Sequence, residues 1–333
     1  MRMAVKQFQY RFLIIASLLG SAALHAIDVE NKEFPLAETK NAPWLTGPLL
    51  APSGNVVPLG SINIEPYLYC SYFTGVYGLD WKTIERPVFS SYALNVPIQF
   101  GIAPRVDFTV SPTVYMNRTQ GKHTWGFGDF VLATGIQLVK EGENYPSVKL
   151  ALQELFPSGK YDQLDPELLF TDGIGGGSYV SSIAIVLGKF FVVQKTHDLN
   201  IRFTAAYSFP SAVSLKGLSF YGGAPNTKGR YYPAQLATMD LGLEYSLTRN
   251  WALALDVLYN YATRTKFVGK NGIGLVSPLG GVLTEVSSQF SLAPAIEYNW
   301  SQSIGLIAGA WFTIAGRNAN VFRNAVIAFN YYK

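Results

Sequence analysis

Long stretches of this chain alternate large apolar side chains with polar or small ones, in segments of about 10–13 residues. The clearest runs from Trp251 to Tyr261, where every odd position is Trp, Leu, Val or Tyr and the even positions, except Leu258, are Ala, Asp or Asn. Successive side chains of a β-strand point to opposite sides, so a period of two predicts a strand with two different faces. The same alternation recurs at 241–247 and 290–298. The sequence therefore predicts an all-β protein.

Three features indicate that the apolar faces meet lipid and the polar faces line an interior. Aromatic residues lie at segment ends, as Trp251 and Tyr261 do, where the aromatic girdles of membrane barrels belong. The opposite faces are rich in Gly, Ala and Ser with scattered carboxylates. Charged residues make up 14% of the chain, no more than the aromatic residues, which is unusual for a soluble surface. These features predict a transmembrane antiparallel up-and-down β-barrel.

The connections between the predicted strands fit the same class. We expect strands near residues 60–73, 88–101, 105–117, 125–139, 147–157, 177–193, 200–210, 235–247, 251–263, 288–300, 303–315 and 321–332. Several connections alternate between short ones, as at 248–250, and long ones, as at 264–287, which is typical of tight periplasmic turns and longer outer loops. About twelve strands, an even number, would return both termini to the periplasm, and ten or fourteen also fit the pattern.

The N-terminal residues predict export. Arg2, Lys6 and Arg11 precede an apolar run at 12–19 that is too short for a membrane helix, and small residues follow, with cleavage expected after Ala23 or Ala26. We therefore expect a signal peptide at 1–26, a proline-rich periplasmic leader or plug at 27–59 and a barrel at 60–333 in a bacterial outer membrane.

The segment 27–59 has two interpretations. Its prolines, at 35, 43, 48, 52 and 58, exclude a regular helix or a central strand. It is either a disordered periplasmic leader or a short plug folded into the periplasmic mouth, with Trp44, Leu45, Leu49 and Leu50 as anchors.

Composition excludes some partners and chemistries. Loss of 1–26 removes three of the 26 basic residues and none of the 22 acidic ones, leaving a net charge of +1 that gives no support for a nucleic-acid partner. The single cysteine, Cys70, cannot form a disulfide within the chain. Beyond the signal the only histidines are His123, expected in an outer loop, and His197, expected in a periplasmic turn, so they cannot share a site. The glycine run at 173–177 precedes strand formers instead of a helix, which disfavours a phosphate loop. We expect no catalytic, cofactor or metal site.

Candidate functional residues are those that the alternation places on the inner face. The charged candidates are Glu65, Asp107, Asp129, Lys149, Arg202, Asp240, Glu244, Asp256 and Glu297, and the aromatic candidates are Tyr67, Tyr69, Tyr115 and Trp311. The acid surplus would disfavour anions in a narrow pore. Alternatively, the acids pair with Lys149, Arg202 and one another and hold a small barrel closed. The aromatic residues either form a track for a hydrophobic solute or fill the interior.

Several short motifs resemble one exported bacterial family. They are Trp-Gly-Phe-Gly-Asp at 125–129, Leu-Phe-Pro-Ser-Gly at 155–159, Asp-Gly-Ile-Gly-Gly-Gly-Ser at 172–178 and the C-terminal part from Leu292 to Asn318. Together they resemble the family labelled MetA-pathway of phenol degradation, over roughly residues 60–332. Phe156 and Ser158 depart from the Leu and Thr that are usual in its Leu-Pro-x-Gly motif. The resemblance implies an outer-membrane barrel that transports aromatic or other hydrophobic compounds.

Taken together, these patterns predict an outer-membrane channel for passive uptake of small hydrophobic or aromatic compounds. The alternative is a non-conducting structural or surface-interaction barrel. The expected partners are outer-membrane lipid, the barrel-assembly machinery and a small hydrophobic or aromatic solute, with no nucleic acid and an undetermined oligomeric state. The C-terminal residues Ala325, Ile327, Phe329 and Tyr331 alternate as an assembly signal requires, although Lys333 and not an aromatic residue is last.

Overall fold

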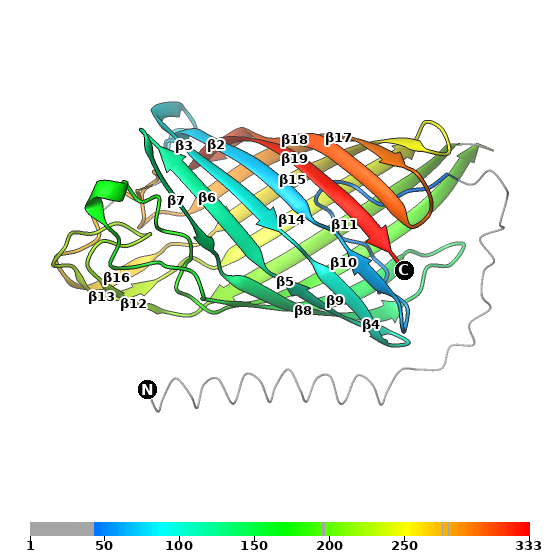
Figure 1. The fold of residues 1–333 in the computed structure, drawn as a ribbon, viewed down its shortest axis with the longest axis horizontal. Helices are drawn as coiled ribbons and strands as arrows, with labels where there is room; N and C mark the ends of the chain where they lie inside the picture. The colour runs from blue at the N-terminus through cyan, green and yellow to red at the C-terminus, as the bar shows by residue number, and fades with distance from the viewer. Residues whose placement is uncertain (1–42, 195–196, 275, 279) are drawn as a thin grey trace. The chain divides into compact units, whose positions relative to one another are not determined.

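The computed structural model describes residues 43–333 except 195, 196, 275 and 279 (Figure 1). Its main element is a 16-stranded antiparallel sheet that closes on itself through the pairing of the first and last strands. The strands of this sheet are β1 (Ile62–Ile64), β2 (Tyr67–Tyr77), β3 (Thr83–Asn95), β4 (Ile98–Ala103), β5 (Val106–Ser111), β6 (Thr113–Thr119), β7 (Lys122–Phe127), β8 (Phe130–Val139), β9 (Ser147–Phe156), β10 (Val180–Gln194), β11 (His197–Pro210), β14 (Leu236–Ser246), β15 (Trp251–Ala262), β17 (Ser287–Asn299), β18 (Ile304–Arg317) and β19 (Ala319–Tyr332).

The first eight of these strands are the halves of four interrupted ones. Three of the breaks fall at Pro66, Pro97 and Pro112, because proline has no N–H to donate to a ladder. The fourth falls at Gly128. β1 continues as β2, β3 as β4, β5 as β6 and β7 as β8, and both halves keep the same neighbouring strand. The result is a closed antiparallel barrel of 12 strands, which confirms the predicted fold class and strand count.

The two faces of the strands lie as the alternation predicts. In β15 the side chains of Trp251 and Leu253 are exposed on the outside, whereas Ala252, Ala254 and Asp256 are buried. Leu258, the apolar exception on the polar face, is buried with them. Among the described residues, no helix is long and apolar enough to cross a membrane.

The connections give the barrel two unlike ends. At the short-turn end lie the turns at 104–105, 247–250 and 300–303, together with the C-terminus. At the long-loop end lie residues 157–179, 211–235 and 263–286, which we call the cap. His197 begins β11 at the short-turn end, but His123 lies within β7 and not in a loop, because the 120–121 turn is tighter than expected.

The cap has a small core and a sheet of its own. Three strands, β12 (Val213–Lys216), β13 (Lys228–Tyr232) and β16 (Lys266–Lys270), form an antiparallel sheet that we call the outer sheet. One of its faces contributes Val213, Leu215 and Tyr231 to a buried cluster with Ile273, against which Tyr221 packs. A short 3-10 helix, η1 (Pro166–Leu168), lies in the first of the long loops.

Candidate functional site: the lumen of the barrel

Residues 43–59, which we call the inner segment, run inside the barrel at its short-turn end. The segment begins beside the β14–β15 turn, where the Trp44 N–H donates to the Arg249 carbonyl oxygen at 2.8 Å. It ends at β4, where the Gly60 N–H donates to the Gly101 carbonyl oxygen at 3.0 Å. Between these points the side chain of Leu49 is fully buried in a cluster of wall residues from β15, β17, β18 and β19. The segment therefore crosses the lumen instead of lining one wall.

Carboxylates of the wall accept hydrogen bonds from the main chain of the inner segment. The Thr46 N–H donates to Glu297 (2.5 Å), the Gly47 N–H to Glu244 (2.9 Å), the Leu50 and Ala51 N–H groups to Asp256 (3.2 and 2.9 Å) and the Val57 N–H to Asp107 (3.0 Å). Hydrogen bonds from backbone N–H to an ionised carboxylate are stronger than those between neutral groups. Four wall acids thus hold a segment that has no regular secondary structure.

The carbonyl oxygens of the same segment are bound by donors of the wall. Asn299 donates to the Trp44 oxygen (2.9 Å), Arg202 to the oxygens of Ala51 (3.1 Å) and Thr46 (3.4 Å), Gln137 to the Gly54 oxygen (2.9 Å) and Lys149 to the Asn55 oxygen (3.3 Å). Acids bind the N–H groups and cations or amides bind the C=O groups. The lumen therefore recognises the peptide main chain of the inner segment.

This arrangement replaces the internal ion pairs considered from the sequence. Glu244, Asp256 and Glu297 are completely buried, and a buried charge is tolerated only where hydrogen bonds or an opposite charge compensate it. Among the described residues, no ion pair joins these acids to Lys149 or Arg202. Main-chain N–H groups of the inner segment compensate them instead, together with the amides of Asn200, which donates to Glu244 (2.9 Å), and Asn299, which donates to Glu297 (2.5 Å).

Side chains of the inner segment add contacts at its ends. The guanidinium of Arg249 lies 4.2 Å from the ring centroid of Trp44, a cation–π contact. Leu50 packs beside Leu49 against the same wall cluster. Leu45, Leu49 and Leu50 also line a cavity of about 710 Å³ between the inner segment and the wall.

Several of the predicted inner residues line this same cavity. They are Glu65, Tyr67, Tyr69, Asp107, Lys149 and Arg202. Glu65 accepts hydrogen bonds from Asn330 (2.6 Å) and Tyr67 (3.3 Å), and the rings of Tyr67 and Tyr69 stack with centroids 5.8 Å apart. The structure brings these residues together with the inner segment at the short-turn end.

The other predicted inner residues have different surroundings. Asp129 lies at the break between β7 and β8 and accepts the N–H groups of Gly159 and Gly176, both at 2.8 Å, so it holds a cap loop. The ring of Tyr115 lies directly beside Gly128 at the same break. Asp240 is buried on β14, and no hydrogen bond joins it to the described inner segment. Trp311 donates from Nε1 to Ser291 Oγ at 2.9 Å.

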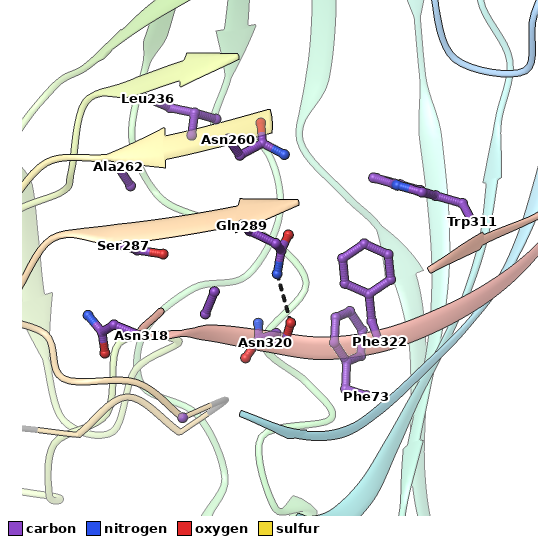
Figure 2. Close-up of a pocket in the computed structure, with 12 residues that line it drawn as sticks. Phe73, Leu236, Asn260, Ala262, Ser287, Gln289, Trp311, Asn318, Asn320 and Phe322 are labelled. Atoms are coloured by element: carbon purple, nitrogen blue, oxygen red, sulfur yellow. Dashed lines mark hydrogen bonds between the residues drawn. The ribbon is translucent and has the colours of Figure 1, made fainter. Parts of the chain in front are cut away.

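Trp311 belongs to a second cavity, of about 490 Å³, near the long-loop end (Figure 2). Figure 2 shows the rings of Phe73, Phe322 and Trp311 gathered on one side, while amide side chains lie on the other side together with Leu236, Ala262 and Ser287. Those amides are Asn260, Gln289, Asn318 and Asn320, and the residues described as lining the cavity include no charged side chain. Sequence reasoning missed this site, although Asn260 and Gln289 stand on polar faces and are paired across β15 and β17.

Comparisons with known proteins bear on the fold alone. No family model and no curated protein matches the sequence. The structure is similar to that of the COG4313 outer membrane channel from Pseudomonas putida F1, with a TM-score of 0.63 and 10% identity over 84% of this chain and 98% of that one. The NanC porin (TM-score 0.42, 9% identity, 80% of this chain and 99% of that one) and the Pseudomonas putida toluene transporter TodX (0.34, 8%, 81% and 88%) are more distant. The chain thus has the fold of an outer-membrane β-barrel.

Proposed function

We propose that this protein is an outer-membrane channel whose inner segment is a plug, and that it admits small uncharged molecules passively. The observation that carries the proposal is the way in which the inner segment is held. Its main-chain groups bind wall acids and cations that water would also satisfy if the segment left the lumen. A segment held in this manner can be displaced without leaving buried charges uncompensated.

The orientation follows from the two ends of the barrel. In outer-membrane barrels the short turns face the periplasm and the long loops face outward. The inner segment then occupies the periplasmic mouth, and the cavity beside Trp311 lies near the outer entrance. A solute would reach the uncharged cavity first and the plugged, charged region second.

The lining of the cavity beside Trp311 suits an uncharged aromatic or hydrophobic solute that carries one hydrogen-bonding group. Phe73, Phe322 and Trp311 offer ring surfaces, and Gln289 and Asn260 offer amide groups. A small-molecule site typically combines apolar walls with a few polar groups that fix orientation. The resemblance to the phenol-degradation family implies the same solute class.

The rival function is a non-conducting structural or surface-interaction barrel. The inner segment crosses the lumen at the short-turn end, and the cap carries a sheet of its own. In either case we expect the barrel-assembly machinery to insert the chain into the outer membrane.

Conductance in planar lipid bilayers separates the two functions. We would compare the mature chain with a variant lacking residues 43–57, after heat-modifiable gel mobility has shown that both are folded. Stable channels that appear or widen on deletion are expected for a plugged channel, whereas silence from both folded proteins would establish the non-conducting barrel.

The same channels test the solute class. Benzyl alcohol and benzoate share one ring and differ in charge, so we expect benzyl alcohol to reduce the current of the open variant and benzoate to have little effect. Trp311→Ala should weaken the block by benzyl alcohol by about 1–2 kcal/mol, roughly five- to thirtyfold in concentration, through lost ring contact. Equal block by both compounds, or a block unaffected by the substitution, would contradict an uncharged aromatic solute.

A further inference from the structure

The face of the outer sheet that points away from the cap core carries a concentrated positive charge. Lys216, Lys228 and Lys270 lie in one cross-strand row, because Lys216 pairs with Lys228 and Lys228 with Lys270. Arg230 and Lys266 lie in the next two rows on the same face. All five side chains are exposed.

Among the described residues, the one acid with a hydrogen bond to a cationic residue of this face is Asp162, which accepts the main-chain N–H of Lys216 at 3.1 Å and forms no ion pair with its ammonium group. The other residues of the three strands on the same side are Ser214, Tyr232 and Val268, so the face has no acid of its own. The ion pairs among the described residues include none of its five cations. Like charges directly opposite each other on neighbouring strands repel, so a row of three lysines is unfavourable until an anion binds to it.

We propose that this face binds the phosphate groups of the glycolipid that forms the outer leaflet of a Gram-negative outer membrane. Lysine binds phosphate as a point charge, and clustered basic residues next to a membrane are attracted to anionic headgroups. Tyr232 and Val268 are 41% and 52% exposed among the cations. A mixture of cations with an exposed aromatic and an exposed aliphatic side chain suits the boundary between headgroups and acyl chains better than it suits a soluble polyanion.

The inference depends on the long loops facing outward and not on transport of any solute. A barrel that conducts nothing would still bind the glycolipid through its cap. Measuring lipid binding therefore tests this inference separately from the proposed channel.

The test uses the full mature protein in a non-ionic detergent. Binding of bis-phosphorylated lipid A would be measured by native mass spectrometry and by fluorescence titration. The variant is Lys216→Gln, Lys228→Gln and Lys270→Gln together. The matched control is Lys82→Gln, Lys122→Gln and Lys140→Gln, which removes three exposed lysines from three other places. Heat-modifiable mobility verifies that each variant is folded.

We expect the first variant to lose about 100-fold in affinity, since each of the three cations near an anionic lipid surface contributes on the order of fivefold. The control should stay within about twofold, and added salt should weaken binding by the wild-type protein. Unchanged binding by the first variant, or an equal loss in the control, would overturn the inference.

Two further ligands distinguish the source of the phosphate. Enzymatically dephosphorylated lipid A should bind at least about tenfold more weakly, because the lysines lose their counter-charge. The deacylated but still phosphorylated disaccharide should also bind more weakly, because Tyr232 and Val268 lose their apolar contacts. Equal affinity for that soluble disaccharide would show a site for soluble phosphosugars and would overturn the assignment to a lipid.

Discussion

Replacing Asp256 by Asn should open the channel, because Asp256 holds the inner segment through two main-chain hydrogen bonds. Its carboxylate accepts the N–H groups of Leu50 (3.2 Å) and Ala51 (2.9 Å) and is completely buried. A hydrogen bond to a charged group contributes about 1.5–3 kcal/mol, and one between neutral groups about 0.5–1.5 kcal/mol. Asparagine keeps one acceptor oxygen and turns an N–H donor toward the other backbone N–H. The free energy that favours the plugged state over the open state should therefore fall by about 2–4 kcal/mol.

At roughly 1.4 kcal/mol for each factor of ten, that loss shifts the ratio of plugged to open molecules by about 30- to 1,000-fold. The matched control is Asp240→Asn, which makes the same change to a buried acid on the neighbouring strand β14. Asp240 has no hydrogen bond to the described inner segment, so its replacement should leave the open fraction nearly unchanged.

Single-channel recording in planar bilayers measures the open fraction of the wild-type protein and of both variants under one voltage protocol. Equal opening by the two variants would show that the loss of a lumen charge, and not the loss of the hydrogen bonds to Leu50 and Ala51, opens the channel. An Asp256→Asn variant that stays as closed as the wild type would show that the inner segment is held by other contacts.

Three other perturbations follow from the same structure. Arg249→Ala removes the contact with the Trp44 ring and leaves the main-chain hydrogen bond in place, so opening should rise only two- to fivefold, for a loss of about 0.5–1 kcal/mol. Gly101→Ala would place a Cβ 1.8 Å from the Pro58 carbonyl oxygen, so the end of the inner segment must shift; proteolysis near residue 58 should become faster without loss of heat-modifiable mobility. Burial raises the pKa of the Tyr221 hydroxyl well above its ordinary value, so the unfolded cap ionises first and cap stability should fall as the pH rises above about 10. Tyr221→Phe should lessen that alkaline loss, and protease digestion of the cap at pH 9 and pH 11 would show it; an identical pH dependence in both proteins would exclude this tyrosine as the cause.

The barrel could be predicted from the sequence because its signal is local. In β15 the type of each residue from Trp251 to Tyr261, except Leu258, indicates which face the residue occupies, and the same rule placed Glu297 and Asp256 on the inner face. The breaks at Pro66, Pro97 and Pro112 were not predicted, because alternation continues on both sides of each one. The outer sheet was also missed, since β12 is four residues long and too short for a periodic pattern.

The partners of the inner acids could not be predicted, for a different reason. The Thr46 N–H meets Glu297 across 251 residues of sequence, and a main-chain donor is the same at every non-proline position. No residue type therefore marks where the inner segment binds. The charges predicted ion pairs between the inner acids and Lys149 or Arg202. In the structure these two cations instead donate to carbonyl oxygens of the inner segment.

Recognition through the main chain also explains how a charged lumen can be closed by the inner segment, which carries no charged side chain. Each wall acid needs hydrogen-bond donors, and the N–H groups of residues 46, 47, 50, 51 and 57 supply them in the plugged state. Water would supply donors in the open state, so the acids are compensated in both and the free-energy difference between the states stays small. Leu49 and Leu50 bury apolar surface against the wall, so opening exposes that surface. An inner segment bound by opposite charges would in addition leave unpaired ions. Main-chain binding to the wall acids avoids the second cost and confines the first to Leu49 and Leu50, which suits a plug that must leave and return.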